Sequence, residues 1–87
     1  MAKYYVTMTD KFMSDWGQAC GKINKLVLAC DTWEEAEIVS TNAEHRREMK
    51  YVNILTKRPS YSSGRYLVSW HDKSDYSSWY VIQHDWN

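Results

Sequence analysis

Hydrophobic and polar positions alternate along five short segments of this chain, which is the pattern of half-buried β-strands. The segments are Lys3–Thr9, Ile23–Cys30, Met49–Lys57, Arg65–His71 and Trp79–His84. The second segment is apolar on both sides, so we expect it to form a central strand. The chain turns at Asp72–Ser77 between the last two segments, and this short connection predicts an antiparallel hairpin.

One helix is predicted between the second and third strands. Thr32 and Glu35 have the spacing of a capping box, and acidic residues in the first turn match the helix dipole. Residues that suit contact with a sheet then recur at helical spacing, namely Trp33, Ala36, Val39, Ser40 and Ala43. We expect the helix to end near Arg46 and Arg47, where positive charge meets the negative end of the dipole.

The order β-β-α-β-β-β predicts a single α+β domain over residues 1–87. We expect one mainly antiparallel sheet of four to five strands, with the helix packed across one face. The rings expected to close the core between helix and sheet are those of Tyr4, Trp33, Tyr66 and Trp70. The rings expected on the other, uncovered face are those of Tyr5, Tyr51 and either Trp79 or Tyr80.

Composition adds a bias toward polar aromatic residues. Thirteen of the 87 residues are aromatic, and all but Phe12 are Tyr or Trp. These side chains combine a large contact area with a hydrogen-bonding tip and are enriched in binding hot spots. Some of them should therefore lie on a binding surface, and the pattern leaves Trp16, Tyr51 and Tyr61 exposed.

The charges cancel in total but are separated along the chain. Eleven basic and eleven acidic residues argue against bulk attraction to nucleic acid or anionic lipid, and against mimicry of nucleic acid. Residues 31–48 hold six acidic and two basic side chains, whereas residues 49–71 hold four basic side chains and no acidic one. The protein is therefore dipolar in sequence.

The first candidate site is the long break in the strand pattern at residues 10–22. It carries Phe12, Met13 and Trp16 among charged residues and is far longer than a tight turn. Such loops in small domains are usually functional or packed as compact surface loops. Two interpretations stay open: Phe12 and Trp16 plug one end of the sheet, or the loop contacts a partner.

The second candidate site is the Ser-rich loop that contains Arg58, Tyr61 and Arg65. Guanidinium groups next to stackable rings suit single-stranded nucleic acid or an acidic patch on a protein. A solvated charged loop explains the same composition. No recognised nucleic-acid-binding motif accompanies it.

No pattern in the chain points to catalysis, a cofactor or a metal. His71 and His84 fall on adjacent predicted strands, but two ligands without a third make an incomplete zinc site. Cys20 and Cys30 lack CxxC spacing and are expected to be free thiols, with Cys30 in the core. We therefore expect a non-enzymatic protein without cofactor or metal. The lack of a leader pattern or a long apolar stretch predicts a cytoplasmic protein without membrane contact.

Three stretches resemble small proteins carried by phages and prophages: residues 3–17 (KYYVTMTDKFMSDWG), 21–27 (GKINKLV) and 49–54 (MKYVNI). The resemblance implies an inhibitor of the anti-CRISPR, or more broadly anti-defence, kind. Such an inhibitor would occupy a functional surface of a host protein or ribonucleoprotein complex in the bacterial cytoplasm, and it would need no catalytic residue.

The leading expectation is thus a protein-binding module. The residues expected to contact the partner are Phe12, Met13, Trp16, Arg58, Tyr61 and Arg65. The alternative is a single-stranded nucleic-acid-binding protein that uses an aromatic sheet face flanked by Lys50, Lys57, Arg58 and Arg65. An unpaired edge strand leaves a homodimer open as well.

Overall fold

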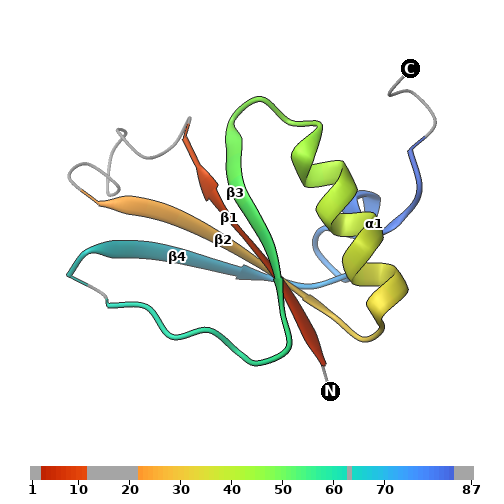
Figure 1. Cartoon of the computed structure of the whole chain (residues 1–87), viewed down its shortest axis with the longest axis horizontal. Helices are drawn as coiled ribbons and strands as arrows, with labels where there is room; N and C mark the ends of the chain where they lie inside the picture. The colour runs from red at the N-terminus through yellow and green to blue at the C-terminus, as the bar shows by residue number, and fades with distance from the viewer. Residues whose placement is uncertain (1–2, 12–21, 63, 84–87) are drawn as a thin grey trace.

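The computed structural model describes residues 3–11, 22–62 and 64–83. Their elements are β1 (Tyr4–Asp10), β2 (Ile23–Cys30), α1 (Trp33–Glu44), β3 (Met49–Leu55), β4 (Tyr66–His71) and a 3₁₀ helix, η2 (Ser77–Tyr80). The four strands form one sheet in the order β3-β1-β2-β4, and α1 packs against it (Figure 1). The predicted α+β class is confirmed.

The sheet is mixed but mainly antiparallel. β1 pairs antiparallel with both β2 and β3, whereas β4 pairs parallel with β2. Because β3 and β4 lie at opposite edges, the connection formed by residues 56–65 has to pass from one edge of the sheet to the other (Figure 1). This connection carries the second candidate site.

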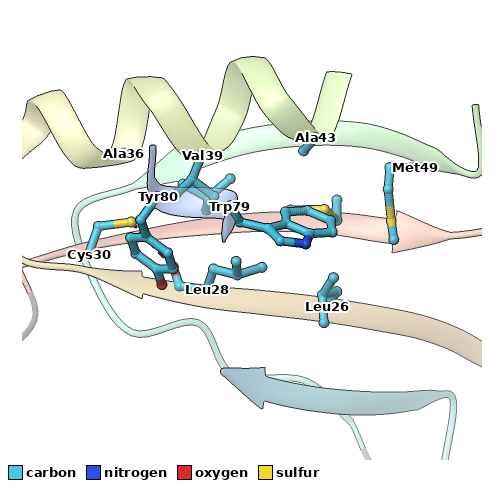
Figure 2. Close-up of a cluster of buried hydrophobic side chains, with 11 residues drawn as sticks. Leu26, Leu28, Cys30, Ala36, Val39, Ala43, Met49, Trp79 and Tyr80 are labelled. Carbon is cyan, nitrogen blue, oxygen red and sulfur yellow. Dashed lines mark hydrogen bonds between the residues drawn. The ribbon is translucent and has the colours of Figure 1, made fainter. Parts of the chain in front are cut away.

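The predicted fifth strand at Trp79–His84 is wrong. After β4 the chain turns and residues Ser77–Tyr80 form η2, which contacts α1. In a strand, Trp79 and Tyr80 would point to opposite faces, because successive side chains alternate. The helical turn instead lets both rings enter the space between α1 and the sheet (Figure 2), where only 8% and 4% of their surface is exposed. The predicted hairpin is therefore also absent, and His84 lies outside the described residues.

The core lies between α1 and the sheet (Figure 2). Its buried members are Val6, Met8, Leu26, Leu28, Cys30, Ala36, Val39, Ala43, Met49, Trp79 and Tyr80. The small residues of the predicted helical stripe let α1 approach the strands closely. Tyr4 packs against this cluster as predicted. Trp33 does not: it is 46% exposed and sets its ring at an angle to that of Tyr4, with centroids 5.6 Å apart.

The start of α1 confirms the predicted cap. The Thr32 hydroxyl accepts the backbone N–H of Glu35 at 3.1 Å, and the Glu35 carboxylate accepts the N–H of Asp31 at 3.2 Å. The carboxylate also pairs with the Lys73 ammonium at 3.1 Å. The bond from Asp31, followed by that from Lys73, holds the pKa of Glu35 below its ordinary value. The helix ends at Glu44, slightly earlier than predicted.

Asn42 joins α1 to η2. Its side-chain amide donates to the carbonyl oxygens of Trp79 at 2.8 Å and Val81 at 3.0 Å, and its side chain is buried. A buried amide is stable only when its polar atoms are paired, so this contact fixes where the C-terminal segment lies on the helix. The hydrophobic pattern gave no sign of this role.

A β-bulge interrupts the pairing of β3 with β1. Thr7 pairs with Asn53 and Thr9 with Lys50, so Tyr51 and Val52 together stand opposite Met8. Tyr51 adopts φ 57°, a left-handed conformation that costs about 1–2 kcal/mol for an L-residue. Tyr51 is 69% exposed, as predicted. The bulge twists the β3 edge and makes it a poor partner for another strand.

We expect Asn42→Ala to lower the free energy of unfolding by about 1–3 kcal/mol, because the buried carbonyl of Trp79 and the partly buried carbonyl of Val81 lose this donor. Chemical denaturation followed by tryptophan fluorescence would measure the change. Thr41→Ala, at an exposed position on the same helix, is the matched control. Equal stability of the two variants would contradict the anchoring role of Asn42.

We expect Glu35 to make the stability depend on pH in the acidic range. Because its pKa is lower in the folded protein than its ordinary value of 4.5, its stabilising effect is complete above that value and is lost as the pH falls through the folded pKa. The difference in melting temperature between wild type and Glu35→Gln should therefore shrink at acidic pH. Glu37→Gln, an exposed residue of the same helix, controls for removal of a helix charge. A difference that stays constant down to strongly acidic pH would contradict this assignment.

Candidate basic aromatic interface

The register of the strands assigns each side chain of the sheet to one of two faces. Trp70 pairs with Val27 and Tyr66 with Ile23, and these positions point away from α1 because Leu26 faces it. The prediction that Tyr66 and Trp70 close the core is therefore wrong. The predicted alternation along β4 is confirmed, but the parallel pairing with β2 places Tyr66 and Trp70 on the face away from α1. Leu67, Ser69 and His71 lie on the side of α1.

The connection between β3 and β4 lays cations over these outward rings. The guanidinium carbon of Arg58 lies 4.1 Å from the centre of the Trp70 ring, and that of Arg65 lies 5.9 Å from the centre of the Tyr66 ring. Tyr61 packs on Tyr66 with ring centres 5.2 Å apart. The ammonium of Lys25, from β2, lies 5.9 Å from the Tyr61 ring.

We call this cluster the basic aromatic face. Its members are Lys25, Arg58, Tyr61, Arg65, Tyr66 and Trp70. Arg58 and Arg65 are exposed, and Trp70 keeps 39% of its surface accessible even with a guanidinium over it. Partial burial lowers the pKa of Lys25, because its ammonium is less hydrated than a free one.

No carboxylate stands on this face of the four strands. The strand positions that point away from α1 hold Lys25, Lys50 and otherwise uncharged residues. On the other side of the sheet, Glu34 and Glu37 are exposed on α1. The acidic side chains of α1 and the cations beside β4 therefore lie on opposite sides of the sheet. Where β4 ends, the carboxylates of Asp72 and Asp75 line a hollow together with Arg58 and Trp70.

The accessible part of the uncovered face lies along β4. At the centre of the sheet, Thr7, Thr9 and Val27 are almost completely buried even though they point away from α1. Beside β4, in contrast, a hollow of about 460 Å³ opens between residues 59–61 and the strand. Lys22, Tyr66 and Trp70 contribute to its walls.

The structure brings three of the six predicted contact residues together. Arg58, Tyr61 and Arg65 all join the basic aromatic face, with Tyr61 half-buried rather than fully exposed. The other three, Phe12, Met13 and Trp16, lie outside the described residues, as does Cys20. Both interpretations of that loop therefore stay open.

Sequence reasoning missed the contribution of Lys25, Tyr66 and Trp70 to this site. Their periodicity showed that Tyr66 and Trp70 share one face, but it did not show which face points toward the helix. A parallel pairing between β2 and β4 would have placed them beside Lys25, and nothing local in the sequence encodes that pairing.

A second cluster lies where β4 ends. The His71 ring nitrogen Nδ1 lies 2.8 Å from Oδ2 of Asp75, and the ring stacks on Tyr76 with centres 4.0 Å apart. This hydrogen bond is the main reason why the pKa of Asp75 lies below its ordinary value. The contacts brace the turn that leads from β4 to η2.

Cys30 is the one cysteine within the described part of the chain, and it is free and buried, as predicted. Burial raises its pKa to about 12, so at neutral pH it is a thiol rather than the nucleophilic thiolate. Among residues 3–11, 22–62 and 64–83, no three His, Cys, Asp or Glu side chains gather as a metal site would require.

We expect Arg58→Ala to lower the free energy of unfolding by only about 0.5–1 kcal/mol, the usual size of an exposed cation–π contact. Urea denaturation would measure the change, and Arg58→Lys should recover part of it. A loss several times larger would mean that the guanidinium holds the fold together rather than being available for binding.

Comparisons of the chain with models of known protein families, with curated proteins and with solved structures give no match. Within the described residues, no helix has the length and apolar character needed to cross a membrane. The most distinctive chemical feature of the described residues is a set of exposed cations supported by aromatic rings.

Proposed function

We propose that this protein is a non-enzymatic binding module that docks its basic aromatic face on an acidic surface of a partner protein. The observation that supports this most strongly is the set of three cation–ring contacts on one face of the sheet: Arg58 on Trp70, Arg65 on Tyr66 and Lys25 on Tyr61. An aromatic ring stacked beneath an Arg guanidinium restricts the motion of that guanidinium. The N–H edge of the guanidinium stays free to bind a carboxylate in a bidentate manner.

The same contacts favour a protein partner over single-stranded nucleic acid. A stacking platform for bases needs open ring faces. Here the ring of Trp70 is covered by Arg58, and those of Tyr61 and Tyr66 pack on each other. These rings support the cations instead of offering flat surfaces to bases. Arg and Trp are also the residue types that contribute most to protein–protein hot spots.

The partner class that we propose is a host defence complex, with the protein acting as an inhibitor of the anti-CRISPR kind. The support for this is the resemblance of residues 3–17, 21–27 and 49–54 to small phage proteins, together with a binding surface that needs no catalytic group. Many defence complexes act on nucleic acid, yet the positive charge of this face argues against competition by mimicry of that nucleic acid.

Charge reversal tests the proposal. Wild-type protein, Arg58→Glu, Arg65→Glu and the control Arg47→Glu would each be immobilised and used to capture proteins from bacterial lysates, with quantification by mass spectrometry. Arg47 is exposed in the turn before β3, at the opposite edge of the sheet. We expect both face variants to reduce capture of an acidic partner by at least about tenfold, whereas the control retains it.

Two outcomes would contradict this function. Capture that is the same for wild type and both face variants would show that another surface binds. Salt-dependent binding of labelled oligothymidylate, lost in Arg58→Glu, would assign the face to nucleic acid instead.

For the inhibitor role, expression of the wild type should raise phage plating on a host with active CRISPR immunity, and Arg65→Glu should not.

A further inference from the structure

The two edges of the sheet differ in how they are protected against pairing with another strand. The β3 edge carries Lys50 and the bulge at Tyr51, and both discourage strand addition. β4 (Tyr66–His71) contains no Lys, Pro, Gly or bulge, and half of its residues (Tyr66, Val68 and Trp70) are of types that favour strands. Natural sheets rarely leave an edge so regular unless another strand pairs with it or a helix or loop covers it.

The backbone groups of β4 that could pair can be identified. The Arg65 carbonyl accepts the N–H of Ile23 in β2 at 3.0 Å, so Arg65 directs its polar groups toward β2. Backbone polar groups alternate in direction along a strand, and the outward set therefore includes the N–H and C=O groups of Val68 and Trp70. In the described residues no hydrogen bond is found for these groups.

Among the described residues, the connection between β3 and β4 flanks this edge and bonds to it where the strand begins, at Tyr66. In Figure 1 the connection runs on the side of β4 that is away from β2, and the contacts of Arg58 with Trp70 and of Tyr61 with Tyr66 keep it close. Within residues 56–62, the backbone hydrogen bond that reaches β4 is at its first residue, where the Tyr66 N–H donates to the Ser62 carbonyl at 2.9 Å, and none reaches Val68 or Trp70. The hollow of about 460 Å³ lies between the two, and its volume is within the range of about 300–1,000 Å³ common for ligand sites.

We propose that the outer edge of β4 accepts an extended segment of the partner protein as a fifth strand, and that this segment alternates acidic and apolar residues. Its side chains on the uncovered face would meet Lys22, Arg58 and Arg65, which calls for carboxylates. Its alternate side chains would lie beside Leu67 and Ser69, on the side of α1, which calls for apolar residues. This inference rests on the proposed function and specifies how the acidic partner is held.

The probe is a short capped peptide of alternating glutamate and valine, titrated into isotopically labelled protein and followed by NMR and calorimetry. We expect binding with chemical-shift changes at the amides of Val68 and Trp70. Val68→Pro should weaken binding by at least about tenfold, because it removes an outward N–H and leaves the bonds to β2 in place. Val68→Ala keeps that N–H and should weaken binding much less.

A second measurement does not depend on the folding of Val68→Pro. The same peptide, N-methylated at alternate residues, can no longer donate to the Val68 carbonyl when the methylated amides face β4. The methyl groups can be placed on either of the two alternating sets of peptide amides. We expect one of these two peptides to bind the wild-type protein with an affinity at least about tenfold lower than that of the parent peptide, and the other to bind as the parent does. Equal binding of both methylated peptides and the parent peptide would overturn strand addition.

Three further results would overturn the inference: no binding of the parent peptide, equal binding by Val68→Pro and Val68→Ala, or self-association of the wild type through β4. The last would appear as a dimer in light scattering that Val68→Pro converts to a monomer. The proposed function is judged separately by Arg58→Glu and Arg65→Glu in the capture assay. If those variants lose the partner while the peptide result is negative, only the strand-addition mode fails.

Discussion

A single helix is too narrow to cover the sheet against which it packs, and the rest of the structure depends on how the chain covers the remainder. An α-helix is about 10 Å wide, whereas four strands spaced about 4.8 Å apart span roughly 14 Å between the outermost axes. α1 contacts β1, β2 and β3. The remaining apolar surface is covered by Trp79 and Tyr80 of η2 (Figure 2), and Asn42 holds that segment on the helix.

The strand order imposes a second condition, because β3 and β4 lie at opposite edges. The chain between them has to travel past β1 and β2, and it ends beside the outward rings of β4. This path brings Arg58 over Trp70 and Tyr61 onto Tyr66. The basic aromatic face therefore follows from topology: its cations come from a connection and its rings from an edge strand.

The parts of this structure that local chemistry determines could be predicted from the sequence. The cap at Thr32, the apolar strand Ile23–Cys30 and the buried positions Ala36 and Val39 each depend on neighbours along the chain. The burial of Trp79 in a helical turn, and the placement of Tyr66 and Trp70 on the face away from α1, could not be predicted. Each depends on contacts between distant segments. A Trp-Tyr pair is compatible with a strand in isolation, and only the space left beside α1 favours the helical turn that buries both rings.

The polar aromatic residues that dominate the composition thus serve two separate purposes. In the core, Tyr80 buries its ring and directs its hydroxyl to the Ala29 carbonyl, so its polar tip is satisfied at the margin of the sheet. On the basic aromatic face, Tyr66 and Trp70 lie beneath cations and contribute little to the core. Because the two groups lie on opposite sides of the sheet, the residues that stabilise the fold are different from those proposed to bind. Substitutions on the basic aromatic face can therefore change recognition while the core remains intact.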